Sequence, residues 1–348
     1  MGRPIVMHLV DDGTAGGVMR VLDHLTSSPE LARFARHRLL FIERGALLQR
    51  PIVADVIVSH MAVSWRTLPL MIALKLRNPD TALVHVEHSY TEGFTLHNVT
   101  HKLRFAMLLR ITYGLFDRII AVSGPQAAWL VRSGAVKAAQ LTVIRSCVNL
   151  SGFRALPRPC GQVRIIGAIG RLDQQKGFEV LIKAFRLTSN RDVALHVYGT
   201  GAQEEELHAL AGADSRIRFF GHTDPLKAMA AVDIVAMPSL WEAYGLVAIE
   251  ALTAGRKLLV NAVDGLQDHI PNGAIAVSGG RLKDWKLAIE ACSQNEPAIC
   301  GTALPEFETA FVEAWHQLMV GLCPSDRHSV LDIKDRSCRT TRVATDGT

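Results

Sequence analysis

Short apolar runs alternate with helix-like patterns along most of the chain. The apolar run at 5–10 leads into a polar, glycine-rich loop and then into a helical pattern over about 19–25. Such a succession is typical of parallel strands covered by helices on both faces. We therefore predict an α/β protein. Its predicted strands are 5–10, 38–43, 55–59, 82–87, 118–122, 141–144, 164–169, 194–198, 217–220, 234–237 and 258–261, and its predicted helices are 19–25, 68–76, 101–116, 126–132, 178–187, 204–210 and 307–318.

A break in this pattern divides the chain. Residues 152–161 contain two prolines and two glycines and fit neither periodicity, which is typical of a linker. The length of 348 residues suits two domains. We expect a first domain over 1–155, a second over 156–305, a terminal helix over 306–322 that is in a position to pack back on the first domain, and a loosely ordered polar tail over 323–348.

Composition excludes several protein classes. Hydrophobic residues make up 49% of the chain and charged residues 20%, as in a well-packed soluble protein. No apolar run reaches the roughly 20 residues of a membrane-spanning helix, and the amino terminus shows no signal-peptide pattern. The six cysteines lack a CxxC spacing and are expected to be reduced thiols. We therefore expect a cytoplasmic protein.

The positive charge is concentrated in the first half. Residues 1–150 hold 17 Lys and Arg against 10 Asp and Glu, whereas the chain as a whole has a net charge of +5. The predicted helix at 101–116 carries Lys102, Arg104 and Arg110 among apolar residues, a pattern that can lie on an anionic membrane. Packing on the sheet and ordinary surface charge explain the same pattern. We expect no nucleic-acid partner, because no recognised binding motif accompanies the charge.

Two glutamates give the second half its clearest chemical signal. Glu242 follows the strand at 234–237, and Glu250 lies two turns inside a helix that begins near Gly245 and that Gly255 is placed to stop. Glu250 is the only charge between Leu246 and Gly255, so its burial requires a hydrogen-bond partner.

The position of Glu250 indicates a ligand. Its side chain shares a helix face with Leu246 and Val247, near the free amides of the first turn, which favour anions. A nucleotide sugar offers a phosphate for these amides, a ribose for Glu250 and hydroxyls for Glu242. A core glutamate and a solvated loop acid are the alternatives.

Basic residues stand at the same predicted sheet edge. Arg171 and Lys176 lie in the loop between the strand at 164–169 and the helix at 178–187. Ligands of parallel sheets bind at the carboxyl ends of strands, where a diphosphate needs positive charge. Arg supplies paired donors and Lys a point charge for such a group.

The first half contributes a glycine loop and a histidine. Gly16 and Gly17 lie between the first strand and its helix, a layout that lets backbone amides approach a phosphate, although a plain tight turn is the alternative. His88 follows the strand at 82–87, and His60 follows the strand at 55–59. A structural role is the alternative for either histidine, and His88 is the stronger functional candidate.

Several motifs follow one another over about 160–275. They are Gly170-Arg171-Leu172, Lys176-Gly177, Tyr198-Gly199-Thr200-Gly201, Phe220-Gly221, Ala231-Val232-Asp233-Ile234-Val235, Pro238-Ser239, and the EX7E pair Glu242 and Glu250 with Tyr244-Gly245-Leu246. In this order and spacing the sequence resembles the family 4 glycosyltransferases, which are retaining enzymes of GT-B architecture. The first half matches more loosely, through Gly16-Gly17, His88 and Ile120-Ala121-Val122-Ser123. The resemblance implies two Rossmann-like domains whose parallel sheets face a central cleft.

The resemblance also implies roles for individual residues. Arg171 and Lys176 would neutralise the donor diphosphate, Glu250 would bind the ribose, and Glu242 would contact the donor sugar. His88 and the amides of the glycine loop would lie on the acceptor side, near the donor sugar and phosphate. The residues expected to bind the donor are Gly16, Gly17, Gly199, Gly201, His222, Gly245, Leu246, Val247 and Glu250, and those expected to be catalytic are Glu242, Arg171, Lys176 and His88.

The implied activity is transfer of a sugar from a nucleotide sugar to a glycan or lipid-linked saccharide in surface polysaccharide biosynthesis. The family needs no metal, and the sequence contains no DxD motif, so we expect no metal and no cofactor. Peripheral contact with the inner face of the plasma membrane fits such an acceptor. A sugar-nucleotide epimerase of GT-B type and a catalytically silent nucleotide-sugar-binding subunit are the alternatives.

Two motifs depart from the family pattern. Ile144-Arg145-Ser146-Cys147-Val148-Asn149 replaces a Pro-Asn-Gly-Val-Asp-like turn before the linker, and Asp264-Gly265-Leu266-Gln267-Asp268 replaces Gly-Gly-x-x-Glu. We expect the first change to affect the hinge and the second to affect a donor-side loop contact.

Overall fold

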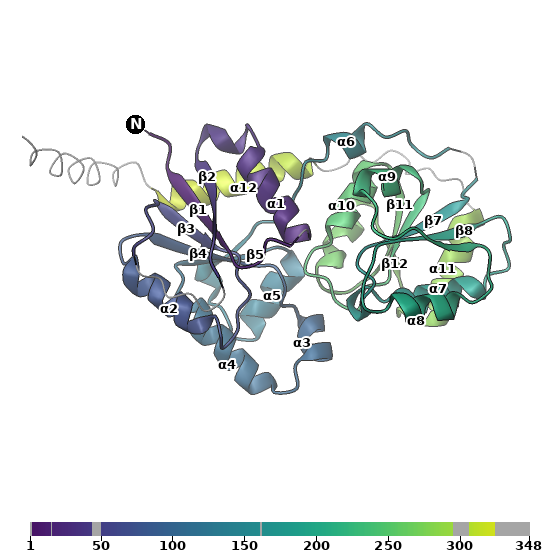
Figure 1. Cartoon of the computed structure of the whole chain (residues 1–348), viewed down its shortest axis with the longest axis horizontal. Coiled ribbons are helices and arrows are strands. Elements are labelled where there is room, and N and C mark those ends of the chain that lie inside the picture. Colours follow the sequence, from purple (N-terminus) through teal and green to yellow (C-terminus); the bar gives the residue numbers. More distant parts are fainter. Residues whose placement is uncertain (1, 15, 44–49, 161, 295–305, 324–348) are drawn as a thin grey trace, which may run out of the picture.

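Two parallel sheets of six strands each form the framework of the protein (Figure 1). The computed structural model describes residues 2–14, 16–43, 50–160, 162–294 and 306–323. Within them, the first sheet has the order β2-β1-β3-β4-β5-β6 and the second β12-β11-β10-β7-β8-β9. The expectation of an α/β protein with two parallel sheets is therefore confirmed.

The first sheet and its helices occupy the first half of the chain. The strands are β1 (Ile5–Val10), β2 (Arg36–Phe41), β3 (Val56–Ser59), β4 (Ala82–Glu87), β5 (Arg118–Ala121) and β6 (Leu141–Val143). The helices are α1 (Gly17–Ser27), α2 (Leu68–Arg77), α3 (Glu92–Asn98), α4 (Lys102–Tyr113) and α5 (Gly124–Arg132), with 3-10 turns η1 (Leu31–Arg33) and η2 (Ala138–Gln140). Every residue of β3 is buried, and three of its four residues are apolar, as expected for a strand covered on both faces.

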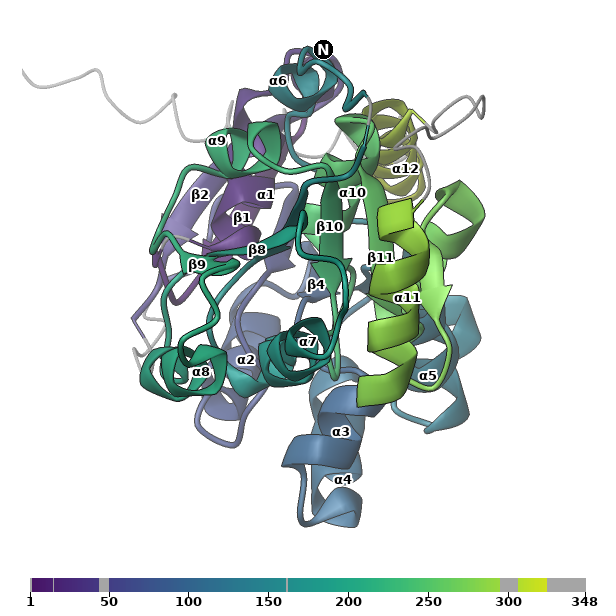
Figure 2. The same ribbon diagram turned by 90° about the vertical axis from the view of Figure 1, so that its right-hand side faces the viewer.

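The second sheet repeats this arrangement. Its strands are β7 (Ile165–Ile169), β8 (Ala194–Tyr198), β9 (Ile217–Phe219), β10 (Ile234–Met237), β11 (Lys257–Asn261) and β12 (Ile275–Val277). Its helices are α7 (Phe178–Arg186), α8 (Glu204–Ala211), α9 (Pro225–Ala230), α10 (Leu246–Thr253) and α11 (Leu282–Gln294), with 3-10 segments η3 (Gln174–Lys176) and η4 (Asp264–Asn272). In Figure 2, α7, α8 and α11 cover the face of this sheet that points away from the first domain, and α10 lies on the opposite face.

The last described helix returns to the first sheet. Helix α12 (Phe307–Leu322) lies beside α1 and β2 in Figure 1. The Trp315 ring meets the His8 ring edge-on, with centroids 5.8 Å apart, and Phe311 stacks on His24 at 5.7 Å. The aromatic face of α12 therefore completes the core under the first sheet, as its amphipathic pattern suggests.

Other details differ from the sequence analysis. Part of the predicted linker forms a one-turn helix, α6 (Ser151–Arg154). The predictions omitted α3, α9, β12 and α11. Of these, α3, α9 and β12 are too short to show a period, whereas α11 buries Trp285, Ile289 and Cys292 at helical spacing and was missed. Most of the predicted polar tail, the end of the predicted second domain, Cys300 and Cys338 lie outside the described residues.

Candidate active site between the two sheets

Loops at the carboxyl ends of both sheets meet between the two halves of the protein. Asp264, which follows β11, accepts hydrogen bonds from Thr91 Oγ1 at 2.6 Å and from the Gly93 amide at 3.0 Å. Both donors follow β4 and belong to the start of α3. Burial raises the pKa of Asp264, and the bonds from Thr91 and Gly93 oppose that shift. The carboxylate thus satisfies a helix start in the opposite domain.

Asp268 makes a second connection of the same kind. Its Oδ2 accepts from the Gly124 amide, at the start of α5, at 3.0 Å and from Arg145 Nε at 2.7 Å. Trp241 adds an aromatic contact across the junction, because its ring stacks on His97 with centroids 5.5 Å apart. The segment that departs from the family pattern therefore joins the two domains in this structure.

Glu250 is buried on α10 and has a partner from the other domain. Its side chain has no exposed surface, and Arg20 Nη2 from α1 lies 2.5 Å from Glu250 Oε1. The approach is an ion pair without hydrogen-bond geometry, so neither carboxylate oxygen has a hydrogen-bond partner among the described residues. Burial raises the pKa of Glu250, and Arg20 opposes the shift. Sequence reasoning missed Arg20, although its position one turn after Gly17 on the predicted helix was visible.

The starts of α1 and α10 approach each other beside this pair. A Cβ atom on Gly17 would lie 3.4 Å from Leu246 Cδ1, so the glycine loop contacts the first residue of α10. Among the described residues, no side chain caps either helix start. Gly245 occupies the N-cap position of α10 and has a positive φ of 90°, a conformation that favours glycine. Two helix starts with uncapped amides provide a positive field suited to an anion.

Lys176 and Glu242 form the second ion pair of the site. Lys176 Nζ, at the end of η3, lies 2.5 Å from Glu242 Oε2, and both side chains are largely buried. Ser239 Oγ also donates to Glu242 Oε2 at 3.4 Å. The backbone of Glu242 is fixed by the Gly265 amide, which donates to its carbonyl at 2.9 Å. These contacts place a lysine and a carboxylate together at the carboxyl edge of the second sheet.

Arg171 lies at the same edge but is more open. Its side chain is 73% exposed and lies 3.3 Å from both Asp173 and Gln175. The loop after β8 packs closely against the backbone around Arg171. A Cβ on Gly199 would lie 1.8 Å from the Gly170 carbonyl oxygen, and a Cβ on Gly201 would lie 2.3 Å from the Leu172 carbonyl oxygen. Gly199 and Gly201 therefore have a packing role, whatever ligand they contact. His222, after β9, is exposed.

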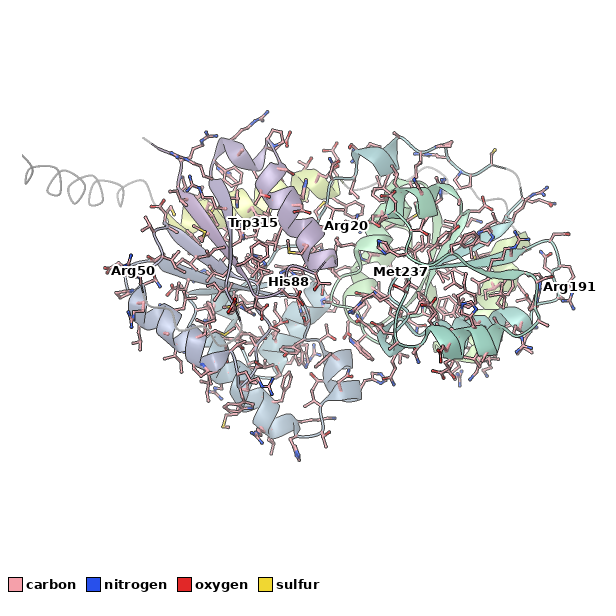
Figure 3. All side chains as sticks on the ribbon, in the orientation of Figure 1. Arg20, Arg50, His88, Arg191, Met237 and Trp315 are labelled. Carbon is pink, nitrogen blue, oxygen red and sulfur yellow. The ribbon has the colours of Figure 1, made fainter. Side chains whose placement is uncertain are left out.

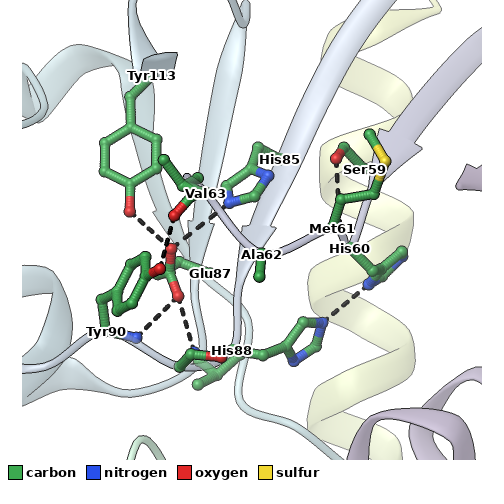
Figure 4. Close-up of polar contacts among 12 residues, drawn as sticks. Ser59, His60, Met61, Ala62, Val63, His85, Glu87, His88, Tyr90 and Tyr113 are labelled. Atoms are coloured by element: carbon green, nitrogen blue, oxygen red, sulfur yellow. Dashed lines mark hydrogen bonds and ion pairs between the residues drawn. The ribbon is translucent and has the colours of Figure 1, made fainter. Parts of the chain in front are cut away.

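His88 is held from two sides at the end of β4 (Figure 4). Its Nε2 lies 2.8 Å from Nδ1 of His60, which follows β3. Glu87 Oε1 accepts from the amides of Ser89 and Tyr90 at 2.7 and 2.8 Å, which fixes the turn that carries His88. Burial lowers the pKa of His88 to about 4, so its imidazole is neutral at pH 7.

Figure 3 places Arg20 and His88 on the side of the first domain that faces Met237, at the end of β10. The structure thus brings Glu250, Lys176, Glu242 and the glycine loop to one interdomain region, whereas Arg171 and His222 lie on its more exposed margin. The ligand roles predicted for all of them remain predictions. Among the described residues, no group of His, Cys, Asp and Glu is arranged to hold a metal ion.

Comparisons with known proteins assign each half to a family. Residues 9–151 match the model of the family described as Glycosyltransferase Family 4. Residues 163–295 match the model of the family described as Glycosyl transferases group 1. A D-inositol 3-phosphate glycosyltransferase of Arthrobacter sp. (strain FB24) is 31% identical over 216 residues, which cover 56% of this chain and 51% of that protein. A D-inositol 3-phosphate glycosyltransferase of Mycobacterium tuberculosis (strain ATCC 25177 / H37Ra) is 30% identical, over 62% of this chain and 49% of its own length. The chain spans about half the length of these curated relatives.

Solved structures share the fold over almost the whole chain. Anabaena HepE in complex with UDP and glucose superposes with a TM-score of 0.69 at 18% identity, over 92% of this chain and all of that one. Sucrose-phosphate synthase from Thermosynechococcus elongatus gives a TM-score of 0.65 at 18% identity, over 96% of this chain and all of that one. The chain belongs to the GT-B glycosyltransferases, with a family 4 domain in its first half and a group 1 domain in its second.

Proposed function

We propose that the protein transfers a sugar, with retention of configuration, from a nucleotide sugar to an acceptor hydroxyl. The observation that carries the proposal is the meeting of two uncapped helix starts, α1 and α10, beside the pairs Arg20–Glu250 and Lys176–Glu242. Phosphate binds well at helix starts and next to Arg and Lys. Carboxylates beside such a site suit the hydroxyls of ribose and sugar. One region therefore offers the complementary groups for each part of a nucleotide sugar.

The leaving diphosphate would be stabilised by this chain's own positive charge. Lys176 is already fixed next to Glu242, so it is preorganised, whereas the open Arg171 side chain is able to close on a bound diphosphate. The helix starts add partial positive charge without any reorganisation. We therefore propose transfer without a metal ion.

Retention fits an attack on the face that the diphosphate leaves. The bond between the anomeric carbon and the phosphate oxygen breaks, and the bond to the acceptor oxygen forms on the same face. The acceptor proton passes to the departing phosphate oxygen, which balances the charge that develops there. His88 and the Gly16-Gly17 loop come from the opposite domain and would orient the sugar and the acceptor.

Two acceptor classes follow from different observations. A glycan or lipid-linked saccharide of surface polysaccharide biosynthesis is the first, because a basic and apolar surface is present on the first domain. A polyol phosphate is the second, because several relatives are named D-inositol 3-phosphate glycosyltransferases. Both acceptors present a hydroxyl, and the charge of a phosphorylated acceptor would suit the excess of Lys and Arg in the first half.

The basic and apolar surface lies on α4 and α2. Leu103, Met107 and Ile111 are exposed at four-residue spacing on α4, which places them on one side of the helix. Leu76 of α2 is also exposed, and the basic residues Lys102, Arg104 and Arg110 flank the apolar row. No helix in the described residues is long and apolar enough to cross a membrane. We propose that this α4 surface contacts an anionic membrane from the cytoplasmic side.

Donor binding and product formation test the proposal. Thermal unfolding should be measured with UDP-, GDP- and ADP-sugars, since a ligand that binds the native state raises its stability. The matching donor is then incubated with saccharide and polyol phosphate acceptors, with chelator present. A product that keeps the donor's anomeric configuration supports the proposal.

Three other results would contradict it. Conversion of the donor to an epimer without acceptor would identify an epimerase, and binding without hydrolysis or transfer would identify a silent subunit. Loss of transfer in chelator, restored by magnesium or manganese, would contradict the metal-free mechanism alone.

A further inference from the structure

Four histidines form a continuous chain across the first sheet. His37 lies on β2, His8 on β1, His60 directly after β3 and His88 directly after β4, and these strands are neighbours in that order. His37 Nδ1 lies 2.9 Å from His8 Nε2, and His8 Nδ1 lies 2.8 Å from His60 Nε2. His60 Nδ1 in turn lies 2.8 Å from His88 Nε2. Each contact has hydrogen-bond length.

The row of four histidines is enclosed by apolar and aromatic groups. His8 and His60 are buried, and the Trp315 ring of α12 covers His8 and His37 edge-on, with centroids 5.8 and 5.9 Å away. Burial lowers the pKa of all four imidazoles, and to about 4 for His37 and His88. The four rings are therefore neutral at pH 7, and each carries one N–H proton.

The number of protons leaves two arrangements. The four neutral rings carry four N–H protons, and each of the three contacts between rings uses one of them. The fourth proton must therefore lie at one end of the row of histidines, on His37 Nε2 or on His88 Nδ1. If His37 donates to His8, every ring donates from Nδ1 and His88 presents Nδ1–H. If His88 donates to His60, every ring donates from Nε2 and the fourth proton is on His37 Nε2. The tautomer of His88 is thus coupled to that of His37, three rings away.

The surroundings of the two ends favour one arrangement. His37 Nε2 is buried and has no hydrogen-bond partner among the described residues. An N–H there would be an orphaned buried donor, which is rarer in proteins than an unused acceptor. His88 is only partly buried, at the carboxyl edge of the sheet where the two domains meet. A proton on His88 Nδ1 can therefore find an oxygen of water or ligand.

We propose that His60, His8 and His37 are positioning residues that hold His88 in its Nδ1–H tautomer, so that it donates a hydrogen bond to an oxygen of the bound sugar or acceptor. This inference rests on the proposed transferase function. Glu87 fixes the backbone directly after His88, and His60 fixes the ring itself. His88 then meets the ligand already oriented, which reduces the entropy cost of reaching the transition state.

Two replacements of His60 separate positioning from packing. In His60→Asn the amide can replace Nδ1 and still donate to His88, whereas His60→Leu fills the buried space but offers no donor. We expect His60→Leu to lower kcat/KM about tenfold, the effect of one lost neutral hydrogen bond, and His60→Asn to recover most of that loss. A packing role would give the opposite order, because Leu suits an apolar site better than Asn. His24→Leu, also under α12 but outside the chain, is the control and should leave kcat/KM unchanged.

The tautomer itself is read without any substrate. Long-range nitrogen–proton NMR of the imidazoles distinguishes Nδ1–H from Nε2–H. We expect His88 as Nδ1–H in the native protein and in His60→Asn, and a mixture of tautomers in His60→Leu. A native His88 with Nε2–H, or a tautomer that His60→Leu leaves unchanged, overturns the proposal. This reading needs no transfer, so it stands apart from a failure of the proposed function, which donor binding and product analysis would reveal.

Discussion

Arg20 of the first domain lies 2.5 Å from Glu250 of the second, and this contact spans the interdomain junction of the protein. The Glu250 side chain is fully buried, whereas 34% of the Arg20 side chain is exposed to solvent. The pair therefore ties the orientation of the domains to the ionisation of a residue expected to bind the donor. A bound ribose and Arg20 would compete for the same carboxylate or share it.

Arg20→Ala should destabilise the protein by about 1–2 kcal/mol. It leaves the buried Glu250 carboxylate without its charged partner, and the partial exposure of Arg20 keeps the cost below that of a fully buried pair. The urea midpoint measures the effect. Arg33→Ala, an exposed arginine of the same domain, is the control. In a Glu250→Gln background the loss should shrink, since no buried charge remains; an equal loss in both backgrounds would show that the pair is not its cause.

Lys176→Ala should lower the rate of transfer about 100-fold. It should also cost stability, because the largely buried Glu242 carboxylate loses its partner, so rates are compared at a temperature where the variant is folded. The lysine is fixed beside Glu242, where it would stabilise the charge that develops on the leaving diphosphate. Arg171→Ala should have a smaller effect, because the exposed Arg171 must first be ordered. Steady-state rates with the identified donor measure both. Lys183→Ala removes a lysine that pairs with Glu179 outside the site and should retain full activity; comparable rates for Lys176→Ala and Lys183→Ala would refute the assignment.

Thr91→Val should weaken the junction between the domains. The hydroxyl donates to Asp264 and accepts from the Phe94 amide, so its loss affects two hydrogen bonds at nearly constant volume. We expect about 1–2 kcal/mol of lost stability. Small-angle scattering should also show a larger radius of gyration. Thr95→Val, on the same helix but bonded only within it, is the control. An unchanged radius and an unchanged unfolding midpoint would contradict a joining role for Asp264.

Stability should fall as the pH is lowered from about 6.5 towards 4. Burial holds the pKa of His8, His37, His60 and His88 below their value in the unfolded chain, so the unfolded state binds more protons in this window. The raised pKa of Glu250 acts in the opposite direction at the acidic end, because the folded state then binds its proton more tightly. Urea midpoints between pH 7 and 5 at constant ionic strength measure the slope.

The variant His37→Asn provides the comparison for this slope. This variant removes one titrating ring and should reduce the change of the urea midpoint with pH. Replacing His101, which is exposed, with Asn should leave that change as it is. A midpoint that rises as the pH falls from 6.5 to 5 would contradict the neutral histidine chain.

The α4 surface should bind anionic vesicles and release them as salt rises. Each basic residue near an anionic membrane contributes on the order of 1 kcal/mol, and salt screens this attraction. Replacing Lys102, Arg104 and Arg110 with Gln should weaken co-sedimentation without changing nucleotide affinity. The matched control replaces Arg33, Arg36 and Arg38, which are also exposed, with Gln. Equal losses for both triple variants, or salt-insensitive binding to neutral vesicles, would exclude docking through α4.

Local patterns in the sequence determined the elements and their family. Strands such as β4 (Ala82–Glu87), β8 and β10 were predicted with the bounds that the structure has, because a parallel strand covered on both faces is rich in apolar residues. The start of α10 near Gly245 was equally visible, since positive φ at a helix start favours glycine. The same local reasoning placed Glu242, Glu250, Arg171 and Lys176 at one sheet edge.

Contacts between distant segments were decided only by the tertiary structure. Arg20 and Glu250 are 230 positions apart, and nothing in their local sequence shows that two domains bring them together. Asp264 was noted only as a departure from a motif, yet it satisfies the start of α3 across the junction. His37, His8, His60 and His88 come from four separate segments, and the strand order β2-β1-β3-β4 makes them neighbours. Sequence periodicity reports which face of an element is buried, whereas partners across domains and strands depend on how the elements pack.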